Sequence, residues 1–170
     1  VLDDVQFPKK GGTWMNRVQI ARDGCPHWLT APVDRSYNGV RSIAEMRFAP
    51  GQSWRREVWR SIDIAYSRAP CWREAADFLK PLVYCESEFI AEYNVSVMHR
   101  FLGALGIDTS RLRLASSLRV NCTGTQRLVQ LTAAVGGSVY LCGGGSSGYL
   151  EPDEFDRAGI ELRLQAFVPR

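Results

Sequence analysis

The sequence predicts an α/β protein with a mainly parallel, Rossmann-like three-layer sheet, a β-rich N-terminal part and a helical middle third. Short apolar runs separated by turn signals fill residues 1–50. The middle of the chain shows helical periodicity, and in the last third helices alternate with apolar strands. This alternation is typical of a parallel sheet, because a crossover helix lets the next strand run in the same direction.

The β-rich part is predicted to contain three strands. They cover residues 17–21, 27–33 and 42–48, and the turn-forming stretches RDGCP and DRSYNG separate them. A basic, glycine-rich loop, PKKGGT, lies between Phe7 and Trp14. Apolar runs of this length are more typical of strands than of helices.

The middle third is predicted to contain three helices. The first covers residues 53–67, where apolar residues recur at helical spacing, and Pro70 ends it. The stretch CWREAADFLKPLVY begins the second. The third covers residues 87–105, and the glycine that follows it, Gly106, is a typical helix C-cap.

The last third is predicted to alternate between the two kinds of element. Strands are expected at residues 111–118, 138–142 and 160–167, and helices at 125–135 and 152–158. The three strands would form most of the parallel sheet.

Composition and charge indicate a single globular domain over residues 1–170, with 45% hydrophobic and 23% charged residues. No apolar run approaches the roughly 20 residues that a membrane span needs, and no signal-peptide pattern opens the chain. The net charge of +3 is small and dispersed, so nucleic acid is not an expected partner. We expect a cytoplasmic protein that acts on a small-molecule substrate. Its oligomeric state and substrate are not indicated.

The cysteine pattern indicates neither a disulfide framework nor a metal site. The chain has five cysteines, and no two of them show the CxxC spacing. We expect reduced, mostly buried thiols, with Cys142 as a buried residue at a strand end. Cys25 and His27 would share one face of a strand, which a thiolate nucleophile requires, but no third orienting group is evident.

A glycine-rich loop, YLCGGGSSGYL, follows the strand predicted at residues 138–142. It lacks the lysine of a phosphate-binding P-loop. Ligands of α/β sheets bind beyond the carboxyl ends of strands, and glycines let backbone N–H groups approach an anion. The residues predicted to bind substrate here are Gly143, Gly144, Gly145, Ser146 and Ser147, and the alternative is a flexible turn.

A second candidate anion site lies at the start of the helix predicted at residues 125–135. Thr123 and Thr125 place hydroxyls beside backbone N–H groups, which attract phosphate or carboxylate. Arg127 lies in the first turn, where the helix dipole disfavours a cation, so an anionic ligand would offset this cost. Helix capping alone also explains the threonines.

The stretch DDVQF is predicted to contribute a carboxylate to the site. Asp4 is the best candidate for a general base. Lys9, Asn16 and Arg17 follow closely and form a polar cluster that could hold a carboxylate or phosphate. We therefore predict Asp4, Asn16 and Arg17 as catalytic residues and Lys9 as a binding residue. For Asn16 and Arg17 the alternative is a turn and a solvated strand edge.

Several blocks of the sequence occur in the order of a known family pattern. They are LDDVQF.K, W.NR..I, WLT.PV, I.E, the tryptophan-rich residues 54–70, LGI, T.RL, YL.GGGSSGYL and F..AGIE. As a series they make the chain resemble the WbqC-like protein family over nearly its whole length.

The resemblance implies a bacterial transferase of cell-surface polysaccharide or natural-product biosynthesis. It would move an acyl or aminoacyl group onto an amino-bearing small substrate such as an amino sugar. The donor would be a nucleotide or a CoA- or carrier-linked compound, and no metal is expected. The alternatives are a nucleotidylyltransferase-like, nucleotide-binding enzyme and a non-catalytic, truncated binding protein.

The chain departs from the family pattern in two places. Members usually carry a strand with a His-Gln-Pro motif before the DDVQF block, and the opening VLDDVQF reads as the end of a strand. We therefore expect a domain that lacks this N-terminal strand and motif. Members also commonly carry a histidine at the position that matches Val58. Loss of either histidine would put catalytic activity in question.

Overall fold

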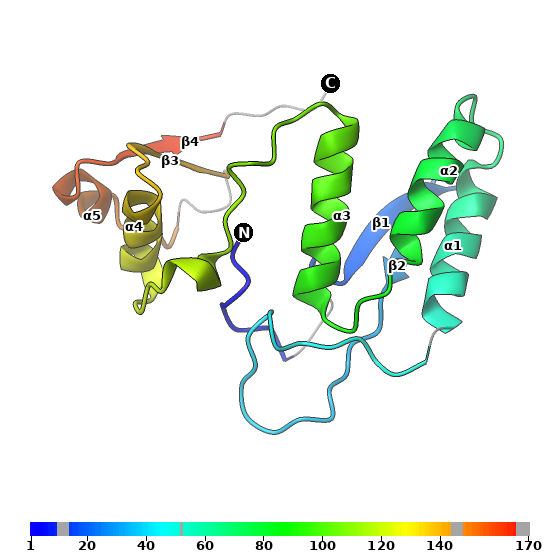
Figure 1. The fold of residues 1–170 in the computed structure, drawn as a ribbon, viewed down its shortest axis with the longest axis horizontal. Coiled ribbons are helices and arrows are strands. Elements are labelled where there is room, and N and C mark those ends of the chain that lie inside the picture. The colour runs from blue at the N-terminus through cyan, green and yellow to red at the C-terminus, as the bar shows by residue number, and fades with distance from the viewer. Residues whose placement is uncertain (10–13, 52, 144–147, 166–170) are drawn as a thin grey trace. The chain divides into compact units, whose positions relative to one another are not determined.

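The computed structural model describes residues 1–9, 14–51, 53–143 and 148–165 (Figure 1). The chain divides into two compact units, Asp3–Arg111 and Leu112–Arg170 together with Val1–Leu2. Within the described residues, each unit contains one two-stranded sheet. That residues 1–170 form a single domain stays a prediction.

The Asp3–Arg111 unit contains a β-hairpin. Strands β1 (Arg17–Arg22) and β2 (Cys25–Thr30) pair in antiparallel register, with Arg22 opposite Cys25. The two loop residues, Asp23 and Gly24, have φ angles of 51° and 76°. Asp-Gly is a typical sequence for such a loop because both positions require positive φ. The first two predicted strands are thereby confirmed.

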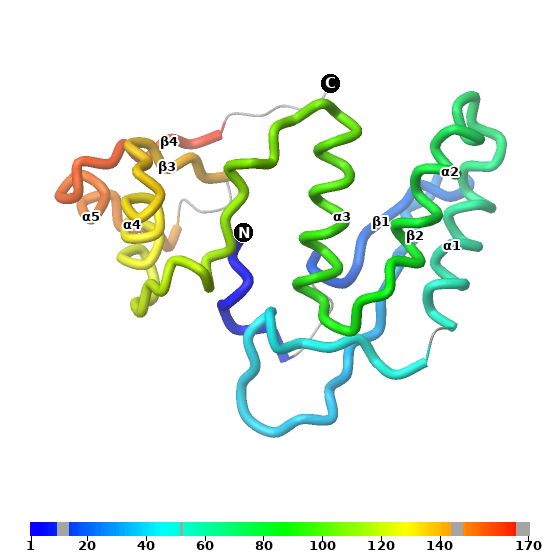
Figure 2. Tube along the Cα trace, in the orientation of Figure 1, coloured from blue at the N-terminus to red at the C-terminus, as the bar shows by residue number. Residues whose placement is uncertain are grey.

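The segment of residues 31–51 contains neither a helix nor a strand (Figure 2). Isolated β-bridges stabilise this segment, and one of them pairs Val33 with Phe48. The strand predicted at residues 42–48 is therefore wrong. The Ser42 amide and hydroxyl both donate to Glu45 Oε2 at 2.8 Å, and this local turn interrupts the segment, whose ends pair only as isolated bridges.

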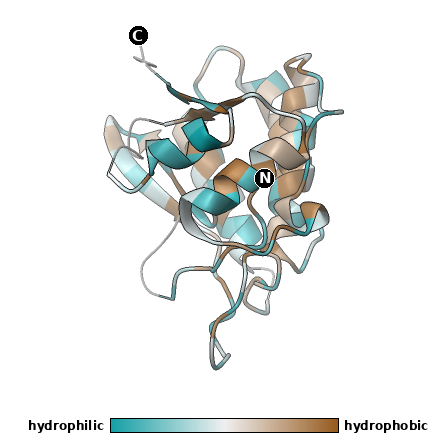
Figure 3. Ribbon diagram, turned by 90° about the vertical axis from the view of Figure 1, so that its left-hand side faces the viewer, coloured by the Kyte–Doolittle hydropathy of each residue, from teal (hydrophilic) through white to brown (hydrophobic). Residues whose placement is uncertain are grey.

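The three predicted helices of this unit are confirmed as α1 (Ser53–Tyr66), α2 (Trp72–Val83) and α3 (Ile90–Ala104). Helices α1 and α2 pack together, and the rings of Trp59 and Trp72 stack with centroids 5.7 Å apart. Figure 3 shows helices that carry both hydrophobic and hydrophilic residues. Each can therefore bury one face while the other faces water.

The hydrophobic core of this unit joins the N-terminal segment, the long irregular segment and two helices. Its buried members are Phe7, Ile43, Met46, Phe48, Trp54 and Ile90. The Ile90 amide donates to the Met46 carbonyl at 3.0 Å, which attaches the start of α3 to the irregular segment.

The other unit contains a parallel pair of strands, β3 (Val139–Cys142) and β4 (Glu161–Leu164). Helices α4 (Gly124–Ala134) and α5 (Pro152–Arg157) also belong to it. All four elements were predicted, and α5 forms the crossover between the two strands.

The strand predicted at residues 111–118 is wrong. Residues Ala115–Leu118 form a short 3-10 helix, η1, and Arg119 after it has a positive φ of 54°. The Ser117 amide and hydroxyl both donate to the Leu114 carbonyl. These local hydrogen bonds use groups that an extended strand would offer to a neighbour.

The predicted Rossmann-like sheet is also wrong. The structure is α/β, but in its described part it holds two small sheets, one antiparallel pair and one parallel pair. A wide parallel sheet would have needed residues 42–48 and 111–118 as strands. Residues 42–48 pair only as isolated bridges with several separate segments, and residues 115–118 form a 3-10 helix, so neither segment is a continuous strand.

Candidate functional site

A pocket of about 420 Å³ lies in the Asp3–Arg111 unit, and its wall is contributed by the hairpin and by α1, α2 and α3. We call it the apolar pocket because most of its lining is hydrocarbon. The aliphatic residues of the wall are Val18, Leu29, Ala31, Val58, Ile62, Leu79, Leu82, Val83 and Val97, and Met15 also lines it. A concave, largely apolar pocket with a few polar groups is the usual form of a small-molecule site.

Three aromatic rings form a second part of the wall. The Phe48 ring lies 4.9 Å from that of Trp54 and 5.4 Å from that of Tyr93, the latter edge to face. Burial raises the pKa of the Tyr93 hydroxyl above its ordinary value, although the nearby Arg55 charge opposes this. The hydroxyl therefore stays protonated at neutral pH and can donate a hydrogen bond.

Two buried N–H groups at the pocket have no hydrogen-bond partner in the described part of the chain. They are Trp54 Nε1, on a side chain that is 6% exposed, and Arg17 Nε. The Arg17 guanidinium carbon lies 3.6 Å from the centroid of the Trp28 ring. A buried donor without a partner costs about 1–3 kcal/mol. Both atoms are shielded from solvent, so a ligand oxygen would remove that cost only after a local side-chain movement.

Two asparagines fix the backbone beside the pocket. Asn16 Nδ2 donates to the Ala31 carbonyl at 2.9 Å, and the Ala31 amide donates back to the Asn16 carbonyl at 2.8 Å. Asn94 Nδ2, from α3, donates to the Met15 carbonyl at 2.9 Å. These bonds hold the start of β1, and with it the Arg17 side chain, at the pocket wall.

The structure brings together only some of the predicted catalytic residues. Asn16 and Arg17 both line the apolar pocket. Asp4 is half-buried and is not among the residues that line it, and Lys9 is exposed. Asp4 and Lys9 therefore stay predictions without support from this pocket.

The predicted anion-site residues of the other unit make contacts within the protein. Thr123 precedes α4 but makes no side-chain capping bond among the described residues. Buried Thr125 accepts a hydrogen bond at Oγ1 from the Glu151 amide at 3.1 Å. Arg127 Nη1 donates to the carbonyls of Val120 and Cys122 at 2.8 and 3.2 Å. Their role toward a ligand stays a prediction.

The glycine loop lies mostly outside the described residues. Gly143 follows β3 directly and is exposed. Gly144, Gly145, Ser146 and Ser147 fall in the part that the structure does not describe. Substrate binding by these five residues stays a prediction.

All five cysteines are free. Cys142 is buried at the end of β3, as predicted, and its Sγ donates to the Arg163 carbonyl at 3.7 Å. The expectation of mostly buried thiols is wrong, since Cys25 and Cys71 are exposed and the other two are partly buried. Within the described ranges, no three His, Cys, Asp or Glu side chains are grouped to hold a metal.

Iodoacetamide is expected to alkylate Cys25 and Cys71 at least about tenfold faster than Cys142, because a thiol must be accessible to react. Peptide mass spectrometry of the folded protein at successive times measures the three rates. The same reagent in urea is the control, since unfolding makes the rates similar. Fast alkylation of Cys142 in the folded protein would contradict its burial.

Comparison with known proteins decides the family. The model of the WbqC-like protein family matches residues 1–170. The chain belongs to the WbqC-like protein family. This WbqC-like chain is 30% identical over 169 residues to the uncharacterized protein Rv1507c of Mycobacterium tuberculosis. The match covers 95% of the chain and 69% of that relative. No solved structure matches.

In this WbqC-like chain, sequence reasoning missed several residues of the apolar pocket. Tyr93, Val97 and Phe101 recur on one helix face, a spacing that predicts core packing, yet all three line the pocket. Val58, where the resemblance implies a histidine in other members, also lines it. Nothing in the sequence pointed to Asn94 as a pocket residue.

No helix in the described part of the chain is long and apolar enough to cross a membrane.

Proposed function

We propose that this WbqC-like chain transfers an acyl or aminoacyl group to an amino-bearing small substrate. An amino sugar of a surface polysaccharide or a natural-product intermediate is the expected kind of acceptor. The observation that best supports the proposal is the apolar pocket of about 420 Å³, whose wall suits an acyl chain. Arg17 at the same wall suits the phosphate groups of a CoA- or carrier-linked donor.

In the proposed reaction the acceptor amine attacks the donor directly, so the protein mainly positions the reactants and stabilises charge. The acceptor amine attacks the acyl carbon, a C–N bond forms, and the carbonyl oxygen takes up negative charge. The bond to the leaving group then breaks, and the amine proton passes to a base. Trp54 lines the pocket, and after a small movement of its ring the buried Nε1–H would donate to the negative oxygen. Asp4 is the candidate base from the sequence alone, since it does not line this pocket.

Filling the apolar pocket is expected to weaken donor binding. Val58→Phe places a larger side chain in the wall, so the affinity for hexanoyl-CoA should fall about tenfold or more, because each excluded CH₂ loses about 0.8 kcal/mol of burial. Isothermal titration calorimetry with hexanoyl-CoA and free CoA measures the change. Val40→Phe is the matched control, since Val40 is 63% exposed in the same unit. Equal affinities of the two variants would place the acyl chain elsewhere.

A turnover assay separates the proposal from its alternatives. Incubation with hexanoyl-CoA and a mixture of amino sugars should give an N-acylated product in the mass spectrum, and Asp4→Asn should slow its formation. Release of pyrophosphate from ATP or CTP without acylation would instead indicate a nucleotidylyltransferase-like enzyme. Binding of hexanoyl-CoA without any product from either assay would indicate a binding protein.

A further inference from the structure

A second pocket, of about 570 Å³, lies in the same Asp3–Arg111 unit. We call it the polar pocket because five charged side chains line it: Asp34, Arg47, Arg55, Glu86 and Glu88. Its wall comes from Asp34, from residues 47–51, from Arg55 in the first turn of α1, and from residues 84 and 86–88. Arg55 is only 8% exposed, so this pocket contains a deeply buried positive charge.

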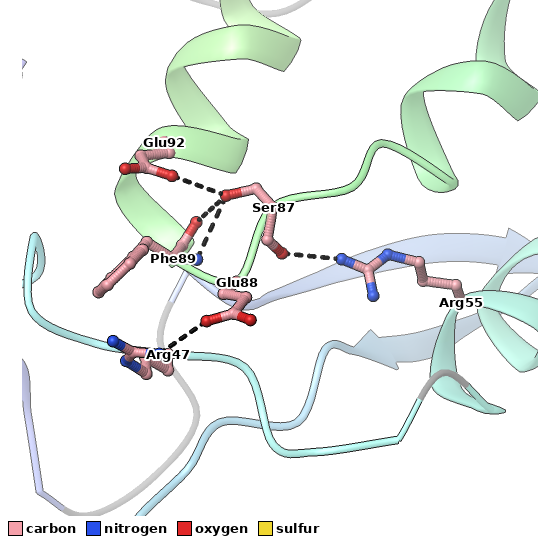
Figure 4. A network of polar contacts seen from close by, with 6 residues as sticks. All are labelled: Arg47, Arg55, Ser87, Glu88, Phe89 and Glu92. Atoms are coloured by element: carbon pink, nitrogen blue, oxygen red, sulfur yellow. Dashed lines mark hydrogen bonds and ion pairs between the residues drawn. The ribbon is translucent and has the colours of Figure 1, made fainter.

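The contacts of Arg55 within the protein leave its charge uncompensated. Arg55 Nη2 donates to the Ser87 carbonyl at 3.0 Å (Figure 4). The guanidinium carbon lies 4.4 Å from the centroid of the Trp54 ring. Its Nε is buried without a hydrogen-bond partner, and no carboxylate pairs with it among the described residues. A buried charge is strongly unfavourable unless an opposite charge and hydrogen bonds compensate it.

The start of α1 adds positive potential at the same place. Arg55 lies in the first turn of this 14-residue helix, where backbone N–H groups have no intrahelical partner and the helix dipole is positive. No acidic residue lies in that turn to offset it. Pro50 and Gly51, which lead into the helix, also line the pocket.

The carboxylates of the polar pocket do not neutralise Arg55. Glu88 Oε2 pairs with Arg47 Nη1 at 2.6 Å, and these side chains are 77% and 49% exposed. Asp34 accepts hydrogen bonds from the Ser36 amide and hydroxyl. Glu86 is exposed to water. Exposed charges are screened by solvent and salt more strongly than the largely buried Arg55 charge.

We propose that the polar pocket binds an oxyanion, a phosphate or carboxylate group of a small molecule, through Arg55 and the first turn of α1. The anion would accept hydrogen bonds from the part of the Arg55 guanidinium that faces the pocket, and not from the buried Nε, and would compensate the charge. The inference does not depend on acyl transfer. Phe48 lines both pockets, so one ligand could place an anionic group here and its apolar part in the other.

Phosphate titration of the whole chain tests the proposal. Inorganic phosphate and acetate are added at constant ionic strength, and the ¹H–¹⁵N signal of Arg55 Nε, assigned by its absence in Arg55→Lys, is followed. A saturable shift with either anion supports the proposal and names the class of anion. Absence of a shift with both anions overturns it.

Two substitutions of opposite expected effect sharpen the test. Arg55→Gln should weaken anion binding about tenfold or more, because a charge-assisted hydrogen bond is lost. Glu88→Gln should strengthen it about twofold, because Arg47 loses its competing carboxylate. Glu88 is exposed, so this variant is informative even if Arg55→Gln fails to fold.

Arg56→Gln is the matched control, because Arg56 is the next residue of α1, is exposed and is not among the lining residues. Its affinity should equal that of the original chain. Equal effects of Arg56→Gln and Arg55→Gln would show only nonspecific charge attraction and would overturn the proposal. So would weaker binding by Glu88→Gln.

Discussion

Replacing Phe7 with alanine is expected to lower the free energy of unfolding of the Asp3–Arg111 unit by about 3–5 kcal/mol. Phe7 is 0% exposed and belongs to the core cluster with Ile43 and Met46. Truncation removes a large buried ring and leaves a cavity that close-packed neighbours cannot fill. Urea unfolding followed by tryptophan fluorescence measures the loss.

Two controls isolate this effect. Phe7→Leu should cost less, because most of the hydrocarbon remains. Leu105→Ala should have almost no effect, since Leu105 is 69% exposed. A loss below about 1 kcal/mol for Phe7→Ala would contradict a fully buried position for this ring.

Replacing Phe155 with alanine is expected to destabilise the other unit, Leu112–Arg170, by about 3–5 kcal/mol. Phe155 is 0% exposed, and its ring stacks on that of Tyr140 with centroids 5.2 Å apart. The contact joins α5 to β3, so its loss should loosen the parallel pair of strands. Thermal unfolding followed by far-ultraviolet circular dichroism measures the change.

The titration of Tyr140 gives this second prediction an independent readout. Burial raises the pKa of the Tyr140 hydroxyl above its ordinary value. Phe155→Ala should let water reach the ring, so the pKa falls toward the ordinary value, as tyrosinate absorbance or NMR would show. Leu164→Ala is the control, because Leu164 is 55% exposed on β4. An unchanged Tyr140 titration in Phe155→Ala would argue against the stacked arrangement.

The helices were predictable because their signal is local. Trp54, Val58 and Ile62 recur at helical spacing, which predicts a helix with one apolar side. In the structure this side of α1 faces the core and the apolar pocket. The Asp23-Gly24 loop likewise determines a hairpin through the φ angles that it permits. In each case the decisive interactions lie within a few residues of one another.

The sheet could not be predicted in the same way. Residues 42–48 and 111–118 are apolar enough for strands, but a strand exists only where a partner offers its backbone groups. Residues 42–48 bond to several separate segments through isolated bridges, with a Ser42–Glu45 turn between them, and Ser117 bonds to Leu114 within a 3-10 helix. Nothing in the alternation of apolar residues reveals this competition.

The candidate site shows the same division. Asn16 and Arg17 attracted attention as a polar cluster, and the structure places both at the apolar pocket. Asp4 of the same cluster is not in that wall. The missed residue Arg55 looks like any charge on an amphipathic helix, and only its burial and bare Nε distinguish it.

The sequence by itself determined the family, the helices, the hairpin and the crossover of this WbqC-like chain. The tertiary structure alone decided that the described sheets are small, that an apolar pocket collects residues from the hairpin and three helices, and that Arg55 is buried with no carboxylate paired to it among the described residues. The physical reason is the distance along the sequence over which each kind of interaction acts. Helix and turn preferences act between near neighbours, whereas pairing, burial and pockets depend on segments that meet only when the chain folds.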